Sequence, residues 1–317
     1  MISVYTDGSS KNGFGHIYRT VNLFYSFKKK ILFLIDKNKN ETEKALIRKI
    51  INKFNFKIKF IKKSIEKEFK ADFNKTLLID HPKNSEKIIN IANQYYKKII
   101  IIDDEGNLKR YNCDLLINQN NYSKKILYKS TNKNIKRLLG TKYTILNSER
   151  IKKKILLKNN NKRILLLFGA TDVCNNYIKF CRKINDYDLF ILVNNKIIEN
   201  KIKNLNSNNI NLLFETSVSE AISKYKIDVV ITCCGSSLYQ LFSYAIPVIG
   251  IKCSYDQRNA YKYYSANKSI IASNLNEIQK DLKKLTLKKK RILIKNSNKF
   301  FNYNGKYLIA STIRKIV

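Results

Sequence analysis

Residues 1–25 read MISVYTDGSSKNGFGHIYRTVNLFY, in which a short apolar run, a glycine-rich loop and an amphipathic stretch follow one another. The run Ile2–Tyr5 has the apolar, β-branched character of a buried strand. The glycine-rich loop after it opens into a segment with helical spacing. A strand that passes through a loop into a helix is the repeating unit of a parallel α/β sheet.

The same alternation continues along the whole chain. The segments between the apolar runs, such as Glu41–Phe54 and Ser85–Tyr96, have the spacing of helices. Continuous apolar strands that alternate with helices indicate parallel sheets covered on both faces. Beyond the first run, strands are predicted at Ile31–Ile35, Lys57–Phe60, Thr76–Ile79, Ile99–Ile102, Leu115–Ile117, Arg163–Phe168, Leu189–Val193, Asn211–Phe214, Asp228–Thr232, Val248–Ile251 and Ile270–Ala272.

A polar stretch rich in Lys and Asn, residues 147–162, separates the strands into two series. The sequence therefore predicts an α/β protein with two doubly wound, Rossmann-like domains in tandem, residues 1–150 and 151–317. The last amphipathic stretch, Lys306–Ile316, either closes the second domain or crosses back onto the first. Ligands of such sheets bind at the carboxyl ends of the strands, so we expect the active site in a cleft between the domains.

The composition is that of a globular protein. Apolar residues make up 44% of the 317 positions, which is the ordinary share for a chain with a sizeable core. No run approaches the ~18 apolar residues of a membrane-spanning helix. Residues 1–13 lack a basic region followed by an apolar stretch, so no signal peptide is predicted. We expect a cytoplasmic protein without stable membrane insertion.

The chain is strongly basic, with 62 Lys and Arg against 24 Asp and Glu and a formal charge of +38. Such a surplus attracts polyanions, including nucleic acid, anionic lipid and phosphorylated substrates. The basic residues are spread along the chain, however, and the abundance of Lys, Asn and Ile is what an AT-rich coding sequence produces. We therefore expect no nucleic-acid partner, and general attraction to phosphates or to a membrane surface stays open.

The cysteine pattern argues against a zinc site. No two of the six cysteines form a CxxC pair, and the chain has only two histidines. Several cysteines lie in or beside apolar runs, which predicts buried, reduced thiols. No metal and no cofactor are expected. The cysteines are Cys113, Cys174, Cys181, Cys233, Cys234 and Cys253.

Three of the nine glycines, Gly8, Gly13 and Gly15, fall in the first loop, TDGSSKNGFGHIYR. Glycine there allows a ligand to approach the backbone closely, and the following helix N-terminus offers unpaired N–H donors. His16 lies at this junction, with Arg19 one turn further on. Histidine is the side chain best suited to proton transfer near neutral pH. A tight turn with a capping histidine is the structural alternative.

Polar residues also end two later strands of the first half. LLIDHP places Asp80 and His81 at the rim where His16 is expected, and IIIIDDEG places Asp103 and Asp104 at the next strand end. A structural cap is the alternative for the first pair. Paired acids can hold a metal, but capping or orientation of a loop explains the second pair equally well.

The second half has three turns that enter helices, in LLLFGATD, TCCGSSLYQ and SYDQ. Backbone N–H groups and hydroxyls in such turns hold a diphosphate without a P-loop lysine. Three such loops in one half favour a nucleotide-diphosphate site. The residues concerned are Gly169, Thr171 and Asp172, then Gly235, Ser236 and Ser237, then Asp256 and Gln257.

A resemblance to a known family rests on eight motifs that follow one another along the chain. They are TDGSSKNGFGHIYR, LLIDHP, IIDDEG, CDLLINQN, LLGTKYTIL, FGATD, GSSLYQL and SYDQ. The chain resembles the UDP-2,4-diacetamido-2,4,6-trideoxy-β-L-altropyranose hydrolases of pseudaminic acid biosynthesis, a family that is similar to GT-B glycosyltransferases. The resemblance implies inverting hydrolysis of a UDP-sugar at its anomeric carbon, with His16 as the general base. UDP is a stable leaving group, so no general acid is needed. The implied partners are the UDP-sugar and water, and the implied role is in flagellin glycosylation or surface polysaccharide.

The resemblance also implies the remaining contacts. The sugar would meet Asp7, Gly13, Gly15, Arg19, Asp80, His81 and Tyr143, and the nucleotide would meet Gly169, Thr171, Asp172, Gly235, Ser236, Ser237, Gln240, Asp256 and Gln257. Five residues depart from the family pattern, and they leave specificity and activity open: Pro82, Asn147, Ala170, Gln240 and Asp256. The alternatives are a GT-B glycosyltransferase with a UDP-sugar donor and a catalytically degenerate sugar-nucleotide binding protein. The sequence makes no prediction of oligomeric state.

Overall fold

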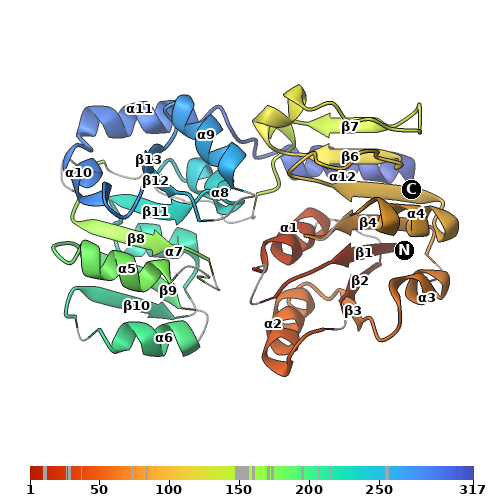
Figure 1. Cartoon of the computed structure of the whole chain (residues 1–317), viewed down its shortest axis with the longest axis horizontal. Helices are drawn as coiled ribbons and strands as arrows, with labels where there is room; N and C mark the ends of the chain where they lie inside the picture. The colour runs from red at the N-terminus through yellow and green to blue at the C-terminus, as the bar shows by residue number, and fades with distance from the viewer. Residues whose placement is uncertain are drawn as a thin grey trace. The chain divides into compact units, whose positions relative to one another are not determined.

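The computed structural model forms two units, each built on one sheet (Figure 1). Unit 1 comprises Met1–Leu146 and Asn302–Val317, and unit 2 comprises Asn147–Phe301. The structure describes residues 1–317 except 10–12, 26, 28–29, 37, 73, 83–84, 147–156, 159–160, 170–171, 173–174, 194–195, 206, 215 and 254–256.

Unit 1 contains a seven-stranded parallel sheet in the order β3-β2-β1-β4-β5-β6-β7. The strand order reverses between β1 and β4, which makes their carboxyl ends the switch point where such sheets bind ligands. The strands are β1 (Ile2–Thr6), β2 (Ile31–Ile35), β3 (Lys57–Phe60), β4 (Thr76–Asp80), β5 (Lys98–Ile102), β6 (Leu115–Asn118) and β7 (Lys136–Leu139).

The helices of unit 1 follow the strands, and local sequence sets where several of them begin. The side chain of Asn40 accepts a hydrogen bond from the N–H of Glu43, and the carboxylate of Glu43 accepts one from the N–H of Asn40. The side chains of Ser64 and Ser85 cap the next two helices by accepting the N–H groups of Lys67 and Ile88. The helices are α1 (Gly15–Phe24), α2 (Glu41–Asn52), α3 (Ile65–Lys70) and α4 (Glu86–Tyr95), with 3₁₀ turns η1 (Asn121–Lys125) and η2 (Thr141–Tyr143).

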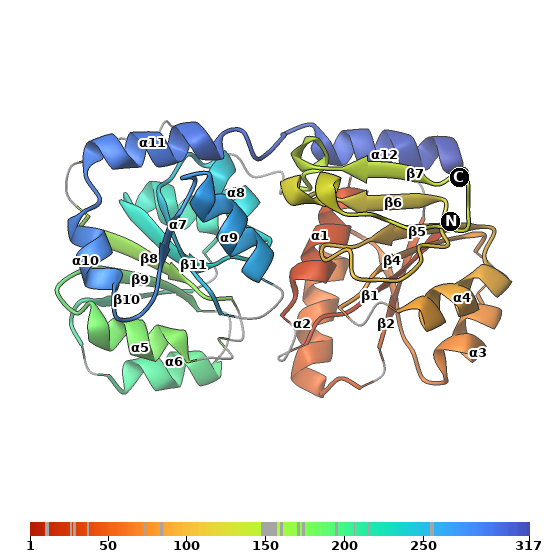
Figure 2. The same ribbon diagram turned by 45° about the horizontal axis from the view of Figure 1, so that its top comes forward.

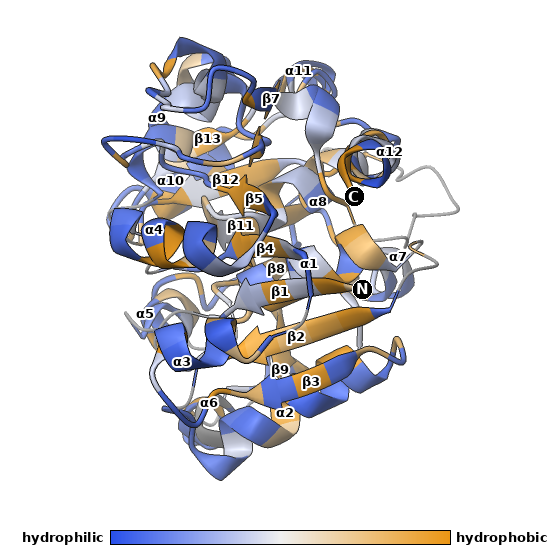
Figure 3. Cartoon of the chain, turned by 90° about the vertical axis from the view of Figure 1, so that its right-hand side faces the viewer, coloured by the Kyte–Doolittle hydropathy of each residue, from blue (hydrophilic) through white to orange (hydrophobic). Residues whose placement is uncertain are grey.

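Burial follows the position of each strand in the sheet. The central strand β1 is buried at all five residues, whereas the edge strand β3, KIKF, alternates between exposed and half-buried. Figure 3 shows the same contrast, with β2 hydrophobic along its length and β3 in mixed colours. Phe69 of α3 and Ala92 of α4 pack with Leu77 and Ile99 in one core cluster on one face of the sheet.

Unit 2 contains a six-stranded parallel sheet in the order β10-β9-β8-β11-β12-β13. Residues of α5, α6 and α10, including Phe180, Ile202 and Leu282, pack with Leu166 and Ile191 of the sheet. The strands are β8 (Arg163–Leu167), β9 (Asp188–Val193), β10 (Ile210–Phe214), β11 (Val229–Cys233), β12 (Val248–Ile251) and β13 (Ile271–Ser273). The helices are α5 (Asn176–Lys183), α6 (Lys196–Lys203), α7 (Val218–Lys224), α8 (Ser237–Ser243), α9 (Arg258–Ala266), α10 (Ile278–Lys283) and α11 (Leu287–Ser297).

The last helix, α12 (Gly305–Ile316), belongs to unit 1 although it follows unit 2 in the chain. It packs against α1 and η2 of the same unit (Figure 2). Its first residue has to be glycine, because a Cβ on Gly305 would lie 2.3 Å from the carbonyl oxygen of Thr144. The guanidinium carbon of Arg314 lies 5.0 Å from the ring centre of Phe27, near the other end of the helix.

The strand predictions and the α/β class are confirmed. One strand, β7, was not predicted, because its sequence KRLL has only two apolar residues and its first two positions are exposed. No helix of the described residues is long and apolar enough to span a membrane.

The expectation of reduced cysteines is wrong for two of them. Cys233 and Cys253 form a disulfide, whereas Cys113, Cys181 and Cys234 are free and buried. The two bonded residues lie at the carboxyl ends of neighbouring strands, since Cys233 is the last residue of β11 and Cys253 comes two residues after β12. This proximity depends on strand order, which a spacing of 20 residues does not reveal. Cys174 lies outside the described residues.

Candidate functional site

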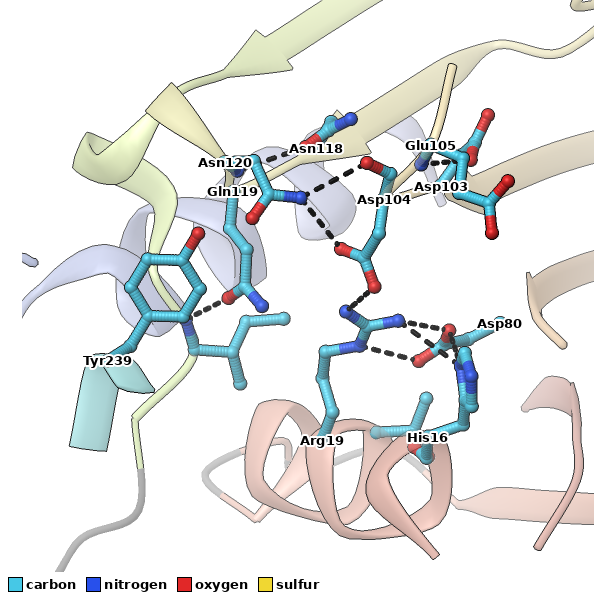
Figure 4. Close-up of polar contacts among 12 residues, drawn as sticks. His16, Arg19, Asp80, Asp103, Asp104, Glu105, Asn118, Gln119, Asn120 and Tyr239 are labelled. Carbon is cyan, nitrogen blue, oxygen red and sulfur yellow. Dashed lines mark hydrogen bonds and ion pairs between the residues drawn. The ribbon is translucent and has the colours of Figure 1, made fainter. Parts of the chain in front are cut away.

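The predicted base, His16, lies at the start of α1 and faces the end of β4. Its Nδ1 atom lies 2.7 Å from Oδ1 of Asp80, and its side chain keeps 25% of its surface exposed. Asp80 is the last residue of β4 and is fully buried. β1 and β4 are neighbours in the sheet, so the loop after β1 carries His16 to the end of β4 (Figure 4).

Arg19 lies three residues after His16, on the same side of α1. Its Nε donates a hydrogen bond to Asp80 Oδ2 over 2.9 Å, and its Nη2 donates to Asp80 Oδ1 over 2.6 Å. A third bond runs from Nη1 to Oδ2 of Asp104 over 2.6 Å. The guanidinium therefore lies between two carboxylates, one at the end of β4 and one after β5 (Figure 4).

The charges around Asp80 keep it ionised. Burial alone would raise the pKa of this carboxyl, but Arg19 and His16 outweigh burial and lower it to about 2. Burial alone would lower the pKa of Arg19, whereas Asp104 and Asp80 raise it. Asp80 is therefore a carboxylate at neutral pH, and it accepts hydrogen bonds without donating any.

This charge state fixes the tautomer of His16. A carboxylate oxygen 2.7 Å from Nδ1 requires the proton on Nδ1. Arg19 Nη2 also lies 3.2 Å from Nδ1, but both groups are then donors and no hydrogen bond joins them. The neutral ring therefore has its lone pair on Nε2, which is the nitrogen able to take a proton.

The network extends along the rim of the sheet. Asn120 Nδ2 donates to the backbone oxygen of Asp104 over 3.2 Å, and it lies 3.4 Å from Asp104 Oδ1. Asp103 faces elsewhere, because Tyr111 donates to its Oδ2 and the N–H groups of Glu105 and Gly106 donate to its Oδ1. Of the paired acids, Asp104 lies beside Arg19 and Asp103 orders its own loop.

His81 belongs to a second cluster at the ends of β1, β2 and β4. Its ring stacks on Tyr5 with centroids 4.4 Å apart, and its Nε2 lies 3.2 Å from Oδ2 of Asp36. Tyr5 donates to the other oxygen of Asp36. Burial alone would raise the pKa of Asp36, but its contacts with His81, Tyr5 and Lys39 lower it.

Among the described residues, this second cluster is a group of side chains whose ligand atoms lie close enough together to hold a cation. Ligand atoms of Asp7, Asp36 and His81 lie within 4.8 Å of one another. The ammonium of Lys39, however, lies 2.6 Å from Oδ1 of Asp7, and both side chains are buried. Lys39 therefore already supplies a positive charge at this position.

The glycines of the first loop have different roles. Gly13 has a φ of +74° and exchanges two backbone hydrogen bonds with Ser9, so it closes a tight turn. Gly15 is the exposed first residue of α1, which begins without a side-chain cap. Tyr143 is half-buried in η2.

In unit 2, Asp172 is a helix cap. Its two carboxylate oxygens accept the N–H groups of Asn176 and Tyr177 over 2.7 and 2.8 Å. Burial raises the pKa of Asp172, and the two N–H donors oppose the rise. Gly169, at the start of the same loop, has a φ of +83° and open space around its Cα. Thr171 and Ala170 lie outside the described residues.

The other two loops of unit 2 lie close together at the ends of β11 and β12. A Cβ on Gly235 would lie 3.8 Å from the side-chain nitrogen of Gln257, and Gln257 Oε1 accepts the N–H of Cys253. Ser236 is exposed and Ser237 half-buried. Gln240 donates to the hydroxyl of Tyr244 one turn along α8. Asp256 and Asn147 lie outside the described residues.

Comparison with known proteins identifies the architecture. No protein-family model matches the sequence, and no curated protein matches it. MurG of Acinetobacter baumannii superposes with a TM-score of 0.64 at 10% identity, over 99% of each chain. UDP-GlcNAc 2-epimerase of Neisseria meningitidis, bound to UDP-GlcNAc, gives 0.62 at 14% identity, over 99% of this chain and 100% of the other. UGT2 of Phytolacca americana, with UDP-2-fluoro-glucose and pterostilbene, gives 0.63 at 10% identity, over 100% of this chain and 99% of the other.

The chain has a GT-B-like fold. At these identities the likeness concerns the fold, so the roles of individual residues depend on the local geometry described above. Within unit 1 the structure brings together His16, Arg19, Asp80 and Asp104, and it places His81 and Asp7 in a separate cluster of the same unit.

Sequence reasoning missed Asp36 and Lys39, which complete the second cluster. Asp36 follows Ile31–Ile35 directly, so its place at a strand end was the available signal. The sequence also did not predict that Asp104 binds Arg19. That contact depends on β5 lying next to β4, and the sequence alone does not order the strands.

Proposed function

We propose that this protein hydrolyses a UDP-linked 2,4-diacetamido-2,4,6-trideoxyhexose to the free sugar and UDP, with His16 as the general base. The observation that carries the proposal is the 2.7 Å contact between His16 Nδ1 and a buried, ionised Asp80. An imidazole that is oriented by a carboxylate, with its second nitrogen unprotonated, is the arrangement that general-base catalysis requires.

The proposed step is an inverting displacement at the anomeric carbon. A water oxygen attacks C1 while His16 Nε2 takes one of its protons. The bond between C1 and the β-phosphate oxygen breaks, and its electrons leave with UDP. UDP departs as a stable anion, so a single base is sufficient and a second carboxyl acid is unnecessary. Asp80 stabilises the imidazolium as it forms.

The nucleotide is assigned to the loops of unit 2. The turn Gly235–Ser237 offers the N–H groups of Ser236 and Ser237 and two hydroxyls, which suit a diphosphate, whereas the N–H of Gly235 donates to the carbonyl oxygen of Cys233. Gln257 lies beside this turn, and Gln240 lies one turn into α8. Several structures with the same fold contain such ligands, including one described as MnaA of S. aureus with UDP. Asp172 supports its loop by capping α5 rather than by binding phosphate directly.

The resemblance assigns the reaction to pseudaminic acid biosynthesis, and hence to flagellin glycosylation or surface polysaccharide. We place the protein in the cytoplasm, as the sequence predicts. The basic surface is attributed to compositional bias, because Lys and Arg occur throughout both units.

Acceptor-free turnover tests this proposal against the transferase alternative. The protein is incubated with the UDP-sugar in ¹⁸O-water, and the anomeric proton and the phosphorus of UDP are followed by NMR. The hydrolase releases sugar and UDP in equal amounts, with no ¹⁸O in UDP. A transferase would show little turnover until an acceptor is added, and a binding protein would show none. Either result would overturn the proposal.

A further inference from the structure

Arg19 is directed into the protein rather than toward a ligand. The family resemblance places it among the sugar contacts, yet Nε, Nη1 and Nη2 each donate to a carboxylate of unit 1. Its side chain is only 6% exposed, although it lies one turn from the exposed start of α1. A guanidinium has five N–H donors in a fixed plane, and three of them are used by Asp80 and Asp104.

The bonds to Asp80 form a two-pronged clamp. Nε and Nη2 bind the two oxygens of one carboxylate, which fixes the carboxylate plane as well as its position. One of those oxygens, Oδ1, also accepts a hydrogen bond from Nδ1 of His16. The orientation of the imidazole therefore depends on a carboxylate whose own orientation Arg19 fixes.

Asp104 provides the second attachment of the clamp. It follows β5, whereas Asp80 ends β4, so Arg19 connects the ends of two neighbouring strands to α1. Asn120, after β6, holds Asp104 in turn through a backbone and a side-chain contact. Without the bond to Asp104, the guanidinium would be held by Asp80 alone and could rotate with it.

We infer that Arg19 is a positioning residue, held by Asp104, which fixes Asp80 so that His16 keeps its proton on Nδ1 and leaves Nε2 as the base. The effect on rate rests on the proposed function, whereas the effect on the tautomer of His16 does not. Since Asp80 is fully buried, its charge needs a charged partner in the protein. Without Arg19 this carboxyl would take up a proton more readily, and a carboxylic acid can donate to Nδ1 and so reverse the tautomer.

The chain is well suited to a direct test because it has only two histidines. In ¹⁵N-labelled protein at about pH 8, where free histidine is neutral, two-bond proton–nitrogen correlations report which ring nitrogen carries the proton. His16→Gln identifies the signals of His16. We expect the Nδ1–H form of His16 in the parent protein and a mixture with a large share of Nε2–H in Arg19→Gln. In Asp104→Ala, where Arg19 stays but is held by Asp80 alone, we expect a smaller share of Nε2–H.

Two matched variants separate positioning from general damage. Asp104→Asn keeps an oxygen that can accept from Arg19 Nη1, so it should restore the Nδ1–H form that Asp104→Ala loses. Asp36→Asn removes the carboxylate beside His81 and should change the signals of His81 while those of His16 stay in place. Substitutions of Asp104 should disturb folding less than those of Arg19, because the Asp104 side chain is 35% exposed. The Asp104 variants therefore keep the test valid if Arg19→Gln does not fold.

Kinetics on the same variants give the second readout. We expect Asp104→Ala to lower kcat about 10- to 100-fold with little change in KM, as misplacement of a catalytic group does. A raised KM with an unchanged tautomer in Arg19→Gln would mean that Arg19 binds substrate, and it would overturn the inference. If the tautomer changes as expected but the parent protein has no hydrolase activity, the proposed function fails and the positioning role stands.

Discussion

Oδ1 of Asp80 lies 2.7 Å from Nδ1 of His16, although the two residues are 64 positions apart in the sequence. The contact forms because β1 and β4 are adjacent and parallel, so their carboxyl ends meet at one rim. Asp80 is buried and ionised there, whereas the imidazole remains partly exposed. A buried charge that orients an accessible base is the central relationship of the proposed site.

Asp80→Asn should lower kcat with little change in KM. Asparagine replaces one of the two carboxylate oxygens by an NH₂ group. If the NH₂ group faces Arg19 Nε, that donor loses its acceptor; if it faces His16, it donates to Nδ1 and reverses the tautomer. The loss should be about a hundredfold or more, since it disables the base. Steady-state kinetics measure it, with circular dichroism to verify folding. Asp36 is the other carboxylate beside a histidine, and the control variant Asp36→Asn should keep most of the activity. An equal loss of kcat in both variants would contradict a specific role for Asp80.

Stability should fall at acid pH in a way that reflects Asp80. Its pKa is lowered from the ordinary 3.8 to about 2 in the folded protein. The resulting stabilisation, of roughly 2 kcal/mol, is fully present above pH 3.8 and is lost as the pH falls through 2. Urea unfolding of the parent protein and of Asp80→Asn between pH 5 and 2 measures it. The account is wrong on this point if both proteins lose the same free energy over that interval.

Reduction of the disulfide between Cys233 and Cys253 should destabilise unit 2. A cross-link that spans about 20 residues restricts the unfolded chain and contributes about 3 kcal/mol. Urea unfolding with and without a dithiol reductant measures the loss. The double variant Cys233→Ser/Cys253→Ser is the control, because reductant should have no further effect on it. Equal stability of the parent protein in both conditions would contradict the prediction.

Gln240→Glu should strengthen UDP binding. The family that the sequence resembles has a glutamate on the ribose at this position, and a charge-assisted hydrogen bond is roughly twice as strong as a neutral one. A gain of about 1 kcal/mol corresponds to about fivefold in affinity. Isothermal titration with UDP measures it. Tyr244→Phe, which removes the present hydrogen-bond partner of Gln240, serves as the control for changes in its orientation. Unchanged affinity in Gln240→Glu would argue that this side chain does not reach the ribose.

The sequence predicted the strands well because parallel strands buried on both faces are continuous apolar runs. It failed at β7, where an edge strand needs few apolar residues. It placed His16, Asp80 and Asp104 at strand ends, but not in contact, since strand ends become neighbours only through strand order. Arg19 shows the same limit, because helical spacing places it beside His16 while the carboxylates that bind it come from two other strands.

Turnover of the UDP-sugar by His16→Gln, beside the parent protein and without acceptor, tests the central claim most directly. Glutamine fills a similar space but cannot take a proton. The account predicts that kcat falls by about 10²–10⁴ while the affinity for UDP, measured by titration, is retained. Equal turnover by the two proteins would contradict the assignment of His16 as the base.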